Sequence, residues 1–278
     1  MGICVAVLDT GIYRHVDFGN RIAGFADMVA GRQNPYDDSG HGTHVAGIIA
    51  GDGTASRGKY VGVAPKSEIV AVKVLDRIGS GIIKNVIKGL MWIEDNRDRY
   101  NIRIINISFG TTSKNIKDEQ EMIKMVEKLW DEGIVIVAAA GNSGPSNNSV
   151  TAPGSSKKII TVGAFDDSTM FKNNSRNVKY FSGRGPTSEC VIKPEVVVAG
   201  ANIVACSNRK DDYSVKSGTS MAAPVVTGAV ARLLELEPQL TPKEVKIRLR
   251  ECCEKIKAPE NQQGWGMLDI ARFVGKGH

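Results

Sequence analysis

Short runs of β-branched residues alternate with helical patterns along this chain, and that alternation limits the possible folds more than any other feature. The runs are apolar on both faces, as the strands of a covered parallel sheet are. They occupy residues 3–8, 69–75, 102–107, 134–138, 159–163 and 195–198. Between several of them apolar residues recur at helical spacing, in 82–99 and 118–132. This order predicts a single α/β domain over residues 1–278, with a mainly parallel central sheet and helices on both faces.

Composition and charge exclude several classes of function. The 278 residues are 42% apolar and 24% charged, which is typical of a globular protein with a sizeable core. The net charge of +6 is modest and the basic residues are scattered, so we expect no nucleic-acid partner. No apolar stretch approaches the roughly 20 residues that span a bilayer, so we expect no membrane partner either.

The five cysteines form no recognisable framework. Cys252 and Cys253 are neighbours and poorly placed to pair, while Cys4, Cys190 and Cys206 are isolated. Because the chain has no CxxC motif, we expect neither a disulfide framework nor a zinc site. Free thiols favour a reducing compartment, so the expected location is cytoplasmic. The alternative is a secreted protein whose leader and propeptide are missing from this chain.

The first strand ends in Asp9-Thr10-Gly11, a sequence that raises the question of a catalytic carboxylate. In a parallel sheet, functional groups collect where strands end, and Asp9 lies at that edge. An aspartic protease needs two such loops whose carboxylates share a proton. This chain has one, and the proteases that complete the pair by dimerising are much shorter all-β chains. That interpretation therefore fails on fold class.

Two histidines follow in the segment "DDSGHGTHVAGIIAG", residues 37–51. Zinc sites on helices need histidines at i, i+4 with a third ligand nearby, and His41 and His44 are three apart. His41 lies between glycines, which give its ring room and access. His44 precedes an apolar run, so we expect it to be a packed, hydrogen-bonded helix residue. His41 becomes informative only if a nucleophile and an orienting acid exist elsewhere.

The nucleophile is expected in "SGTSMAAPVVTGAVARLL", residues 217–234. Ser220 lies where a glycine-flanked loop turns into a nearly all-apolar helix. Such a helix must be buried, so its N-terminus directs free N–H groups and a positive dipole end at Ser220. A helix N-cap at Ser220 or Thr219 is the alternative if this segment is taken alone. Together with Asp9 and His41, the chain order Asp, His, Ser is that of subtilisin.

The chain resembles the subtilisin-like serine proteases (subtilases) over essentially its whole length. The blocks that carry the resemblance are "VAVLDTGI" around Asp9, "HGTHVAG" around His41 and "GTSMAAP" around Ser220. Three further landmarks, "NISFG", "AAAGNSG" and "FSGRGP", stand between them in the family's order. The segments "GKYVGVAP" and "VKVLDRIGSG" are most similar to the bacterial intracellular, AprX-like branch. The resemblance implies a three-layer subtilisin-like sandwich.

The resemblance also implies a role for each catalytic residue of a serine endopeptidase. Ser220 attacks the scissile carbonyl, His41 transfers the proton, and Asp9 stays ionised while it orients the imidazole. Asn142, in "AAGN", matches the amide of the oxyanion hole, although alone it could equally be a turn residue. The rival hypothesis is a catalytically silent subtilase-like module used for binding or regulation. Pseudoenzymes usually lose a catalytic residue, and all four are present here, so the sequence favours activity.

A polypeptide substrate is expected to bind as an extended strand between two exposed edges. The matching edge residues are Ser108, Phe109 and Gly110 on one side and Gly79, Ser80 and Gly81 on the other. Leu75 and Ile83 match the walls of apolar subsites, and Ala139, Ala140, Gly141, Thr151 and Gly154 match the lining of the primary pocket. That lining has no charged residue, so uncharged side chains are expected just before the cleaved bond.

The remaining expectations concern Lys216, cofactors, an inhibitory propeptide and one structural turn. Lys216 matches a position that, in the family, borders the pocket for the first substrate residues after the cleaved bond. Its charge would attract acidic side chains there. The alternative is that Lys216 points to solvent. The chemistry requires no cofactor. Structural calcium is possible in this family, but no specific site is predicted. An inhibitory propeptide is a possible partner that this chain does not contain. Ala199 replaces the usual proline of a structural turn.

Overall fold

The computed structural model describes residues 2–111, 116–166, 171–173, 176–178 and 180–275. Its centre is a nine-stranded sheet with the strand order β12-β13-β9-β6-β5-β4-β1-β3-β2. The strands are β1 (Cys4–Asp9), β2 (Ile22–Asp27), β3 (Glu68–Lys73), β4 (Ile102–Ile107), β5 (Val135–Ala139), β6 (Ile160–Ala164), β9 (Val196–Val198), β12 (Cys253–Glu254) and β13 (Met267–Leu268). All neighbours are parallel except β12 and β13. The expected mainly parallel sheet is confirmed.

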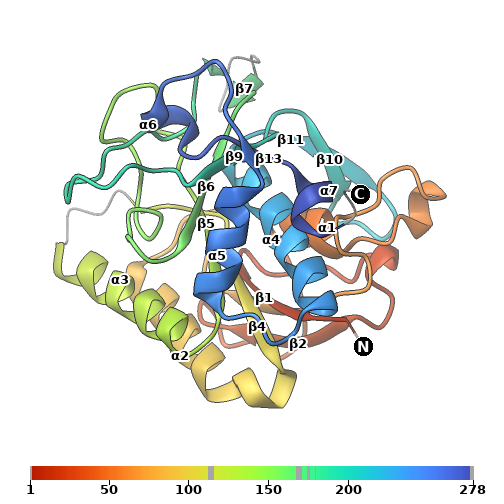
Figure 1. Cartoon of the computed structure of the whole chain (residues 1–278). Coiled ribbons are helices and arrows are strands. Elements are labelled where there is room, and N and C mark those ends of the chain that lie inside the picture. Colours follow the sequence, from red (N-terminus) through yellow and green to blue (C-terminus); the bar gives the residue numbers. More distant parts are fainter. Residues whose placement is uncertain (1, 112–115, 167–170, 174–175, 179, 276–278) are drawn as a thin grey trace.

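Helices cover both faces of this sheet (Figure 1). The long ones are α1 (His41–Ala50), α2 (Ile83–Tyr100), α3 (Ile116–Asp131), α4 (Thr219–Leu236) and α5 (Pro242–Glu251). α6 (Glu260–Gln263), α7 (Ile270–Phe273) and two 3-10 turns, Val16–Phe18 and Thr54–Ser56, are short. α2 packs with α3, and α1 packs with α4. These two pairs form the outer layers of the three-layer sandwich. No helix in the described part of the chain is long and apolar enough to cross a membrane.

Seven of the described strands lie outside the pattern that the sequence revealed, among them β2 and two hairpins. β2 is an edge strand whose residues are mostly half-buried, so its sequence is not apolar on both faces as those of the central strands are. The hairpin of β10 (Ile203–Cys206) and β11 (Tyr213–Lys216) lies outside the main sheet, as does the pair β7 (Phe171–Asn173) and β8 (Arg176–Val178). The six predicted strands and both predicted helices are present, with ends that differ from the predicted ones by at most two residues.

The arrangement places the sequence landmarks at one edge of the sheet. β1, β4 and β5 lie side by side and parallel, so the residues that follow them lie at the same edge. α4 packs against β4, β5 and β6, and most of its residues are buried, as expected for the apolar helix that follows Ser220. The N-termini of α1 and α4 carry His41 and Ser220. All five cysteines are unpaired.

Candidate active site

Asp9 ends β1 with a fully buried side chain. Its Oδ1 accepts a hydrogen bond of 2.7 Å from the backbone N–H of Thr10 and another of 2.7 Å from Nδ1 of His41. Because a carboxylate only accepts, the proton of the His41 ring lies on Nδ1, and Nε2 is the basic nitrogen. The two residues therefore form an oriented carboxylate–imidazole pair.

His41 is the first residue of α1, and glycines make this position possible. Gly40 adopts the left-handed conformation with a φ of 82° before the helix. Gly42 packs so closely on the loop after β1 that an added Cβ would lie 2.2 Å from the carbonyl oxygen of Gly11. The glycines that flank His41 therefore serve the contact between α1 and the Asp9 loop. The His41 side chain remains 26% exposed.

Burial works to lower the pKa of His41, but the charge and the hydrogen bond of Asp9 outweigh it and leave the pKa above its ordinary value. The ammonium group of Lys216 acts in the opposite direction to Asp9 and limits the rise. Asp9 therefore stabilises the protonated form of His41.

Asp37 ties the loops that carry Asp9 and His41 together, a role that the sequence analysis missed. Its carboxylate accepts hydrogen bonds from the Thr10 hydroxyl at 2.8 Å, the Gly40 N–H at 2.8 Å and the Thr43 hydroxyl at 2.6 Å. Burial works to raise the pKa of Asp37, yet the hydrogen bonds from Thr43, Gly40 and Thr10 hold it below its ordinary value. Asp37 therefore stays ionised and fixes the start of α1 against the end of β1.

His44 has the structural role that the sequence predicted. It is fully buried, and its Nε2 lies 3.0 Å from the carbonyl oxygen of Ser214 and 3.2 Å from that of Ile203, which only accept. Burial and then the charge of Lys216 lower the pKa of His44 to about 3. His44 therefore stays neutral and links α1 to the β10–β11 hairpin.

The N-terminus of α4 is organised by Asn142. The Asn142 Oδ1 accepts hydrogen bonds from the Thr219 N–H at 3.0 Å and from the Thr219 hydroxyl at 3.1 Å. The same hydroxyl accepts a bond of 3.2 Å from the Gly141 N–H. Because Oδ1 is engaged in this way, the Nδ2 group of Asn142 is the donor left for a ligand. Thr219 therefore positions Asn142 beside Ser220, and the sequence analysis did not identify that role.

One cleft of about 410 Å³ brings most of the predicted residues together. It is lined by Ser39, His41, Leu75, Ile78, Gly79, Ser108, Phe109, Gly110, Ala139, Gly141, Asn142, Ser143, Thr151, Lys216 and Ser220. An adjoining hollow of about 500 Å³ shares Leu75, Gly79, Phe109 and Gly110 with it and adds Ser80, Gly81 and Ile83. Asp9, Ala140 and Gly154 are buried and are not among the residues that line either hollow, although Ala140 and Gly154 were predicted to line the primary pocket.

The packing of Thr151 explains why two positions of the cleft wall are glycine. A Cβ at Gly110 would lie 1.8 Å from the Thr151 hydroxyl, and a Cβ at Gly141 would lie 2.4 Å from it. A glycine at a substrate-binding edge can serve the close approach of a peptide backbone. At Gly110 the observed reason is the packing of Thr151 across the wall. Gly79 differs: it adopts a φ of 76°, and a Cβ there would meet nothing within 4 Å.

Charge in the main cleft comes from two lining residues, His41 and Lys216. Lys216 ends β11 and is half-buried. The group of side chains with metal-ligand spacing found in the described chain lies elsewhere, at His15, Asp17 and Cys206. The cleft thus offers a base, a hydroxyl and amide donors.

Comparison with known proteins identifies the family of this chain. The subtilase family model matches residues 1–266. The serine protease AprX of Bacillus subtilis is 42% identical over 98% of this chain, which spans 66% of AprX. Subtilisin BL of Lederbergia lenta is 34% identical over 96% of this chain and 89% of its own length.

Solved structures of similar proteins have the same fold. A psychrophilic protease named S41 superposes with a TM-score of 0.82 at 29% identity, covering 96% of this chain and 91% of its own. Sphericase superposes with a TM-score of 0.80 at 30% identity and the same coverage. The family match, the sequence identity and the shared fold agree, and this chain belongs to the subtilase family.

Proposed function

We propose that this chain is a serine endopeptidase in which Asp9, His41 and Ser220 form the catalytic triad. The observation that carries the proposal is the 2.7 Å hydrogen bond between Asp9 and Nδ1 of His41, in a ring that lines the same cleft as Ser220. With Nδ1 bound to the carboxylate, Nε2 is the nitrogen left to accept the Ser220 proton.

The reaction proceeds in two halves. Ser220 Oγ attacks the scissile carbonyl carbon while its proton passes to Nε2 of His41, and a tetrahedral intermediate forms. The C–N bond then breaks, His41 gives the proton to the leaving amine, and an acyl-enzyme remains. A water molecule then attacks the acyl-enzyme by the same steps, with His41 again transferring the proton, and the carboxylic acid product is released from Ser220. Asp9 stabilises the imidazolium in both halves and stays ionised.

The oxyanion of each tetrahedral intermediate is stabilised by two donors. They are the Nδ2 group of Asn142 and the backbone N–H of Ser220, which is near the positive end of α4. Thr219 holds the Asn142 oxygen through two hydrogen bonds, so the amide is already oriented before substrate binds. A donor fixed in this way costs no reorganisation during the reaction. Thr219 is therefore a positioning residue for Asn142.

An extended polypeptide is the proposed substrate, bound along the two adjoining hollows. Ser108–Gly110 and Gly79–Gly81 flank these hollows on either side and supply backbone groups for strand addition. The primary pocket takes an uncharged side chain, because residues 139–143 and 151–154 carry no charge to pair with an ion. Lys216 favours acidic residues immediately after the cleaved bond.

Hydrolysis of matched peptides tests this function. The peptides differ only in the residue before the cleaved bond, which is leucine, phenylalanine, aspartate or lysine. We expect the neutral peptides to have a kcat/KM about 10²-fold or more above the charged ones, because an unpaired ion in a partly desolvated pocket costs several kcal/mol. The Ser220→Ala variant is the control for contaminating peptidases. Absence of hydrolysis, or equal cleavage after aspartate and leucine, would contradict the proposal.

A further inference from the structure

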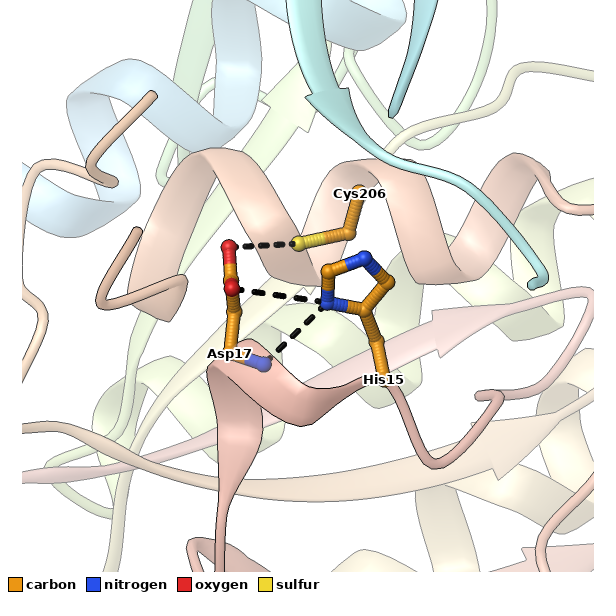
Figure 2. Close-up of side chains that lie close together, drawn as sticks. All are labelled: His15, Asp17 and Cys206. Atoms are coloured by element: carbon orange, nitrogen blue, oxygen red, sulfur yellow. Dashed lines mark hydrogen bonds and ion pairs between the residues drawn. The ribbon is translucent and has the colours of Figure 1, made fainter. Parts of the chain in front are cut away.

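A second cluster of reactive side chains lies away from the cleft, at His15, Asp17 and Cys206. Asp17 lies in the 3-10 turn Val16–Phe18, His15 caps the start of that turn, and Cys206 ends β10 (Figure 2). All three are buried, with exposures of 2%, 0% and 1%. Figure 2 shows the imidazole, carboxylate and thiol directed at one another. Three groups that bind metals well are therefore enclosed together without belonging to the proposed peptidase machinery.

The spacing of the three groups matches that of ligands around one small metal ion. Cys206 Sγ lies 3.5 Å from Oδ2 of Asp17, and Nδ1 of His15 lies 3.7 Å from Oδ1 of Asp17. The three ligand atoms all lie within 4.8 Å of one another. Around a tetrahedral zinc ion, with bonds of about 2.0–2.3 Å, neighbouring ligand atoms are about 3.3–3.8 Å apart. The side chains therefore need only small movements to enclose an ion.

Surrounding backbone groups already orient two of these side chains. Nε2 of His15 lies 3.0 Å from the carbonyl oxygen of Asp212, which only accepts, so Nε2 carries the proton and Nδ1 carries the lone pair. Oδ1 of Asp17 accepts a hydrogen bond of 2.8 Å from the Ala55 N–H. A carbonyl that fixes the histidine tautomer and a donor that holds the carboxylate are the usual outer partners of metal ligands.

Two hydrogen bonds link members of the cluster. The backbone N–H of Asp17 donates to Nδ1 of His15 at 3.1 Å across a tight two-residue turn. The Cys206 thiol, a weak donor, approaches the Asp17 carboxylate at 3.5 Å. A metal ion replaces both contacts with stronger bonds. The Tyr213 hydroxyl donates a hydrogen bond of 2.7 Å to Oδ2 of Asp17 and helps to hold that carboxylate in place.

We propose that His15, Asp17 and Cys206 bind one Zn²⁺ ion in a buried structural site. Nitrogen, oxygen and sulfur together suit zinc, whereas calcium requires six to eight oxygen ligands and this cluster offers one carboxylate. On binding, the thiol loses its proton and Cys206 ligates as the thiolate. Cysteine spacing could not reveal the site, since Asp17 and Cys206 are 189 residues apart.

The position of the cluster indicates what the ion does. Cys206 packs on α1, where an added Cβ at Gly47 would lie 2.9 Å from its sulfur atom. His15 and Asp17 belong to the segment that follows the Asp9 strand. The ion therefore fastens that segment to the hairpin packed on the helix that begins with His41. We expect zinc to stabilise the fold and to leave the chemistry in the cleft unchanged.

Metal content and cobalt spectroscopy test the site without measuring peptidase activity. The full chain, carrying Ser220→Ala to prevent self-cleavage, is expressed in medium supplemented with Zn²⁺ or with Co²⁺, because a closed site is loaded as the chain folds. We expect about one equivalent of zinc after gel filtration. The cobalt form is expected to show tetrahedral d–d bands and a thiolate-to-cobalt charge-transfer band. Cys206→Ser should abolish that band, and the matched control Cys253→Ser should retain it.

Several results of these experiments would contradict the zinc site. Folded protein that contains less than about a tenth of an equivalent of zinc, or cobalt protein without a thiolate band, would overturn the proposal. So would a thiolate band that survives Cys206→Ser. If Cys206→Ser does not fold, His15→Gln decides: a charge-transfer band of unchanged position and intensity in that variant would rule out His15 as a ligand. A melting temperature that falls when zinc is removed by a chelator would support the site.

Discussion

Two aspartate–histidine pairs in this molecule use the same side chains in different surroundings. In the first, Asp9 binds Nδ1 of His41 at 2.7 Å, and the ring is 26% exposed at a cleft. In the second, Oδ1 of Asp17 lies 3.7 Å from Nδ1 of His15, and both side chains are fully buried. Nε2 of His15 donates to the Asp212 carbonyl, so that ring has no nitrogen free for a substrate.

The difference shows that a carboxylate beside a histidine does not by itself make a general base. In the proposed mechanism the base needs its second nitrogen at an accessible surface beside the attacking hydroxyl, and His41 lines the same cleft as Ser220. His44 extends the lesson, since it follows His41 by three residues but bonds only to carbonyl oxygens. Burial lowers its pKa to about 3, whereas Asp9 raises that of His41.

The largest effect is expected from removing each histidine in turn. His41→Ala should lower kcat by about 10⁶-fold, the scale known for subtilisin, because Ser220 loses its base. His15→Gln should change kcat by less than about ten-fold at a temperature where it is folded, and lower the melting temperature instead. Steady-state kinetics and thermal unfolding of both variants measure this contrast. Similar losses of kcat in both would abolish the distinction between the two pairs.

The oxyanion donor should come next in magnitude. Asn142→Leu removes the Nδ2 donor and should lower kcat by about 10²–10³-fold with little change in KM. Thr219→Val keeps the amide but removes one of the two bonds to its oxygen, so a smaller loss of kcat is expected. Thr219→Ser, which keeps the hydroxyl, is the matched control and should stay close to wild type. An effect of Asn142→Leu mainly on KM would make Asn142 a binding residue.

The pH dependence should separate His41 from an ordinary histidine. Protonated His41 cannot accept the Ser220 proton, so kcat/KM should fall as the pH drops through the His41 pKa. Because Asp9 raises that pKa, the midpoint should lie above the reference value of about 6.5. A pH–rate profile of wild type measures the midpoint. A midpoint well below 6.5 would contradict the stabilisation of the imidazolium by Asp9.

The smallest expected effect belongs to Lys216. Its charge lowers the His41 pKa, so Lys216→Glu should move the acid limb of the profile to higher pH. The same change should reduce the preference for acidic residues after the cleaved bond by about 1.5- to 5-fold, more at low salt than at high salt. Lys216→Gln is the uncharged intermediate. Library profiling that finds no acidic enrichment in wild type would show that Lys216 simply points to solvent.

Local patterns in the sequence were sufficient for the α/β order and for the motifs around Asp9, His41 and Ser220. Each of these residues lies where a strand or a helix begins or ends, and such positions leave a local signal. The strand β2 left no such signal in the sequence, because it is an edge strand whose residues are mostly half-buried.

Residues that act through distant partners could not be predicted in this way. Thr219 binds Asn142 across 77 positions, and Asp37 binds Thr10 across 27. Neither residue type is unusual at its place, since threonine and aspartate are common beside helix N-termini. The cluster of His15, Asp17 and Cys206 depends on the packing of the β10–β11 hairpin, which lies outside the main sheet. Tertiary contacts of this kind require the structure.

The central claim is that Ser220 is a nucleophile activated by the open pair of Asp9 and His41. Labelling with a fluorophosphonate probe, followed by peptide mapping, tests it most directly. We predict one covalent adduct, on Ser220 of the native protein, that is lost on denaturation and in Ser220→Ala and forms far more slowly in His41→Ala. Native, folded protein that does not react, or a Ser220→Ala variant that is labelled to the same extent, would contradict the account.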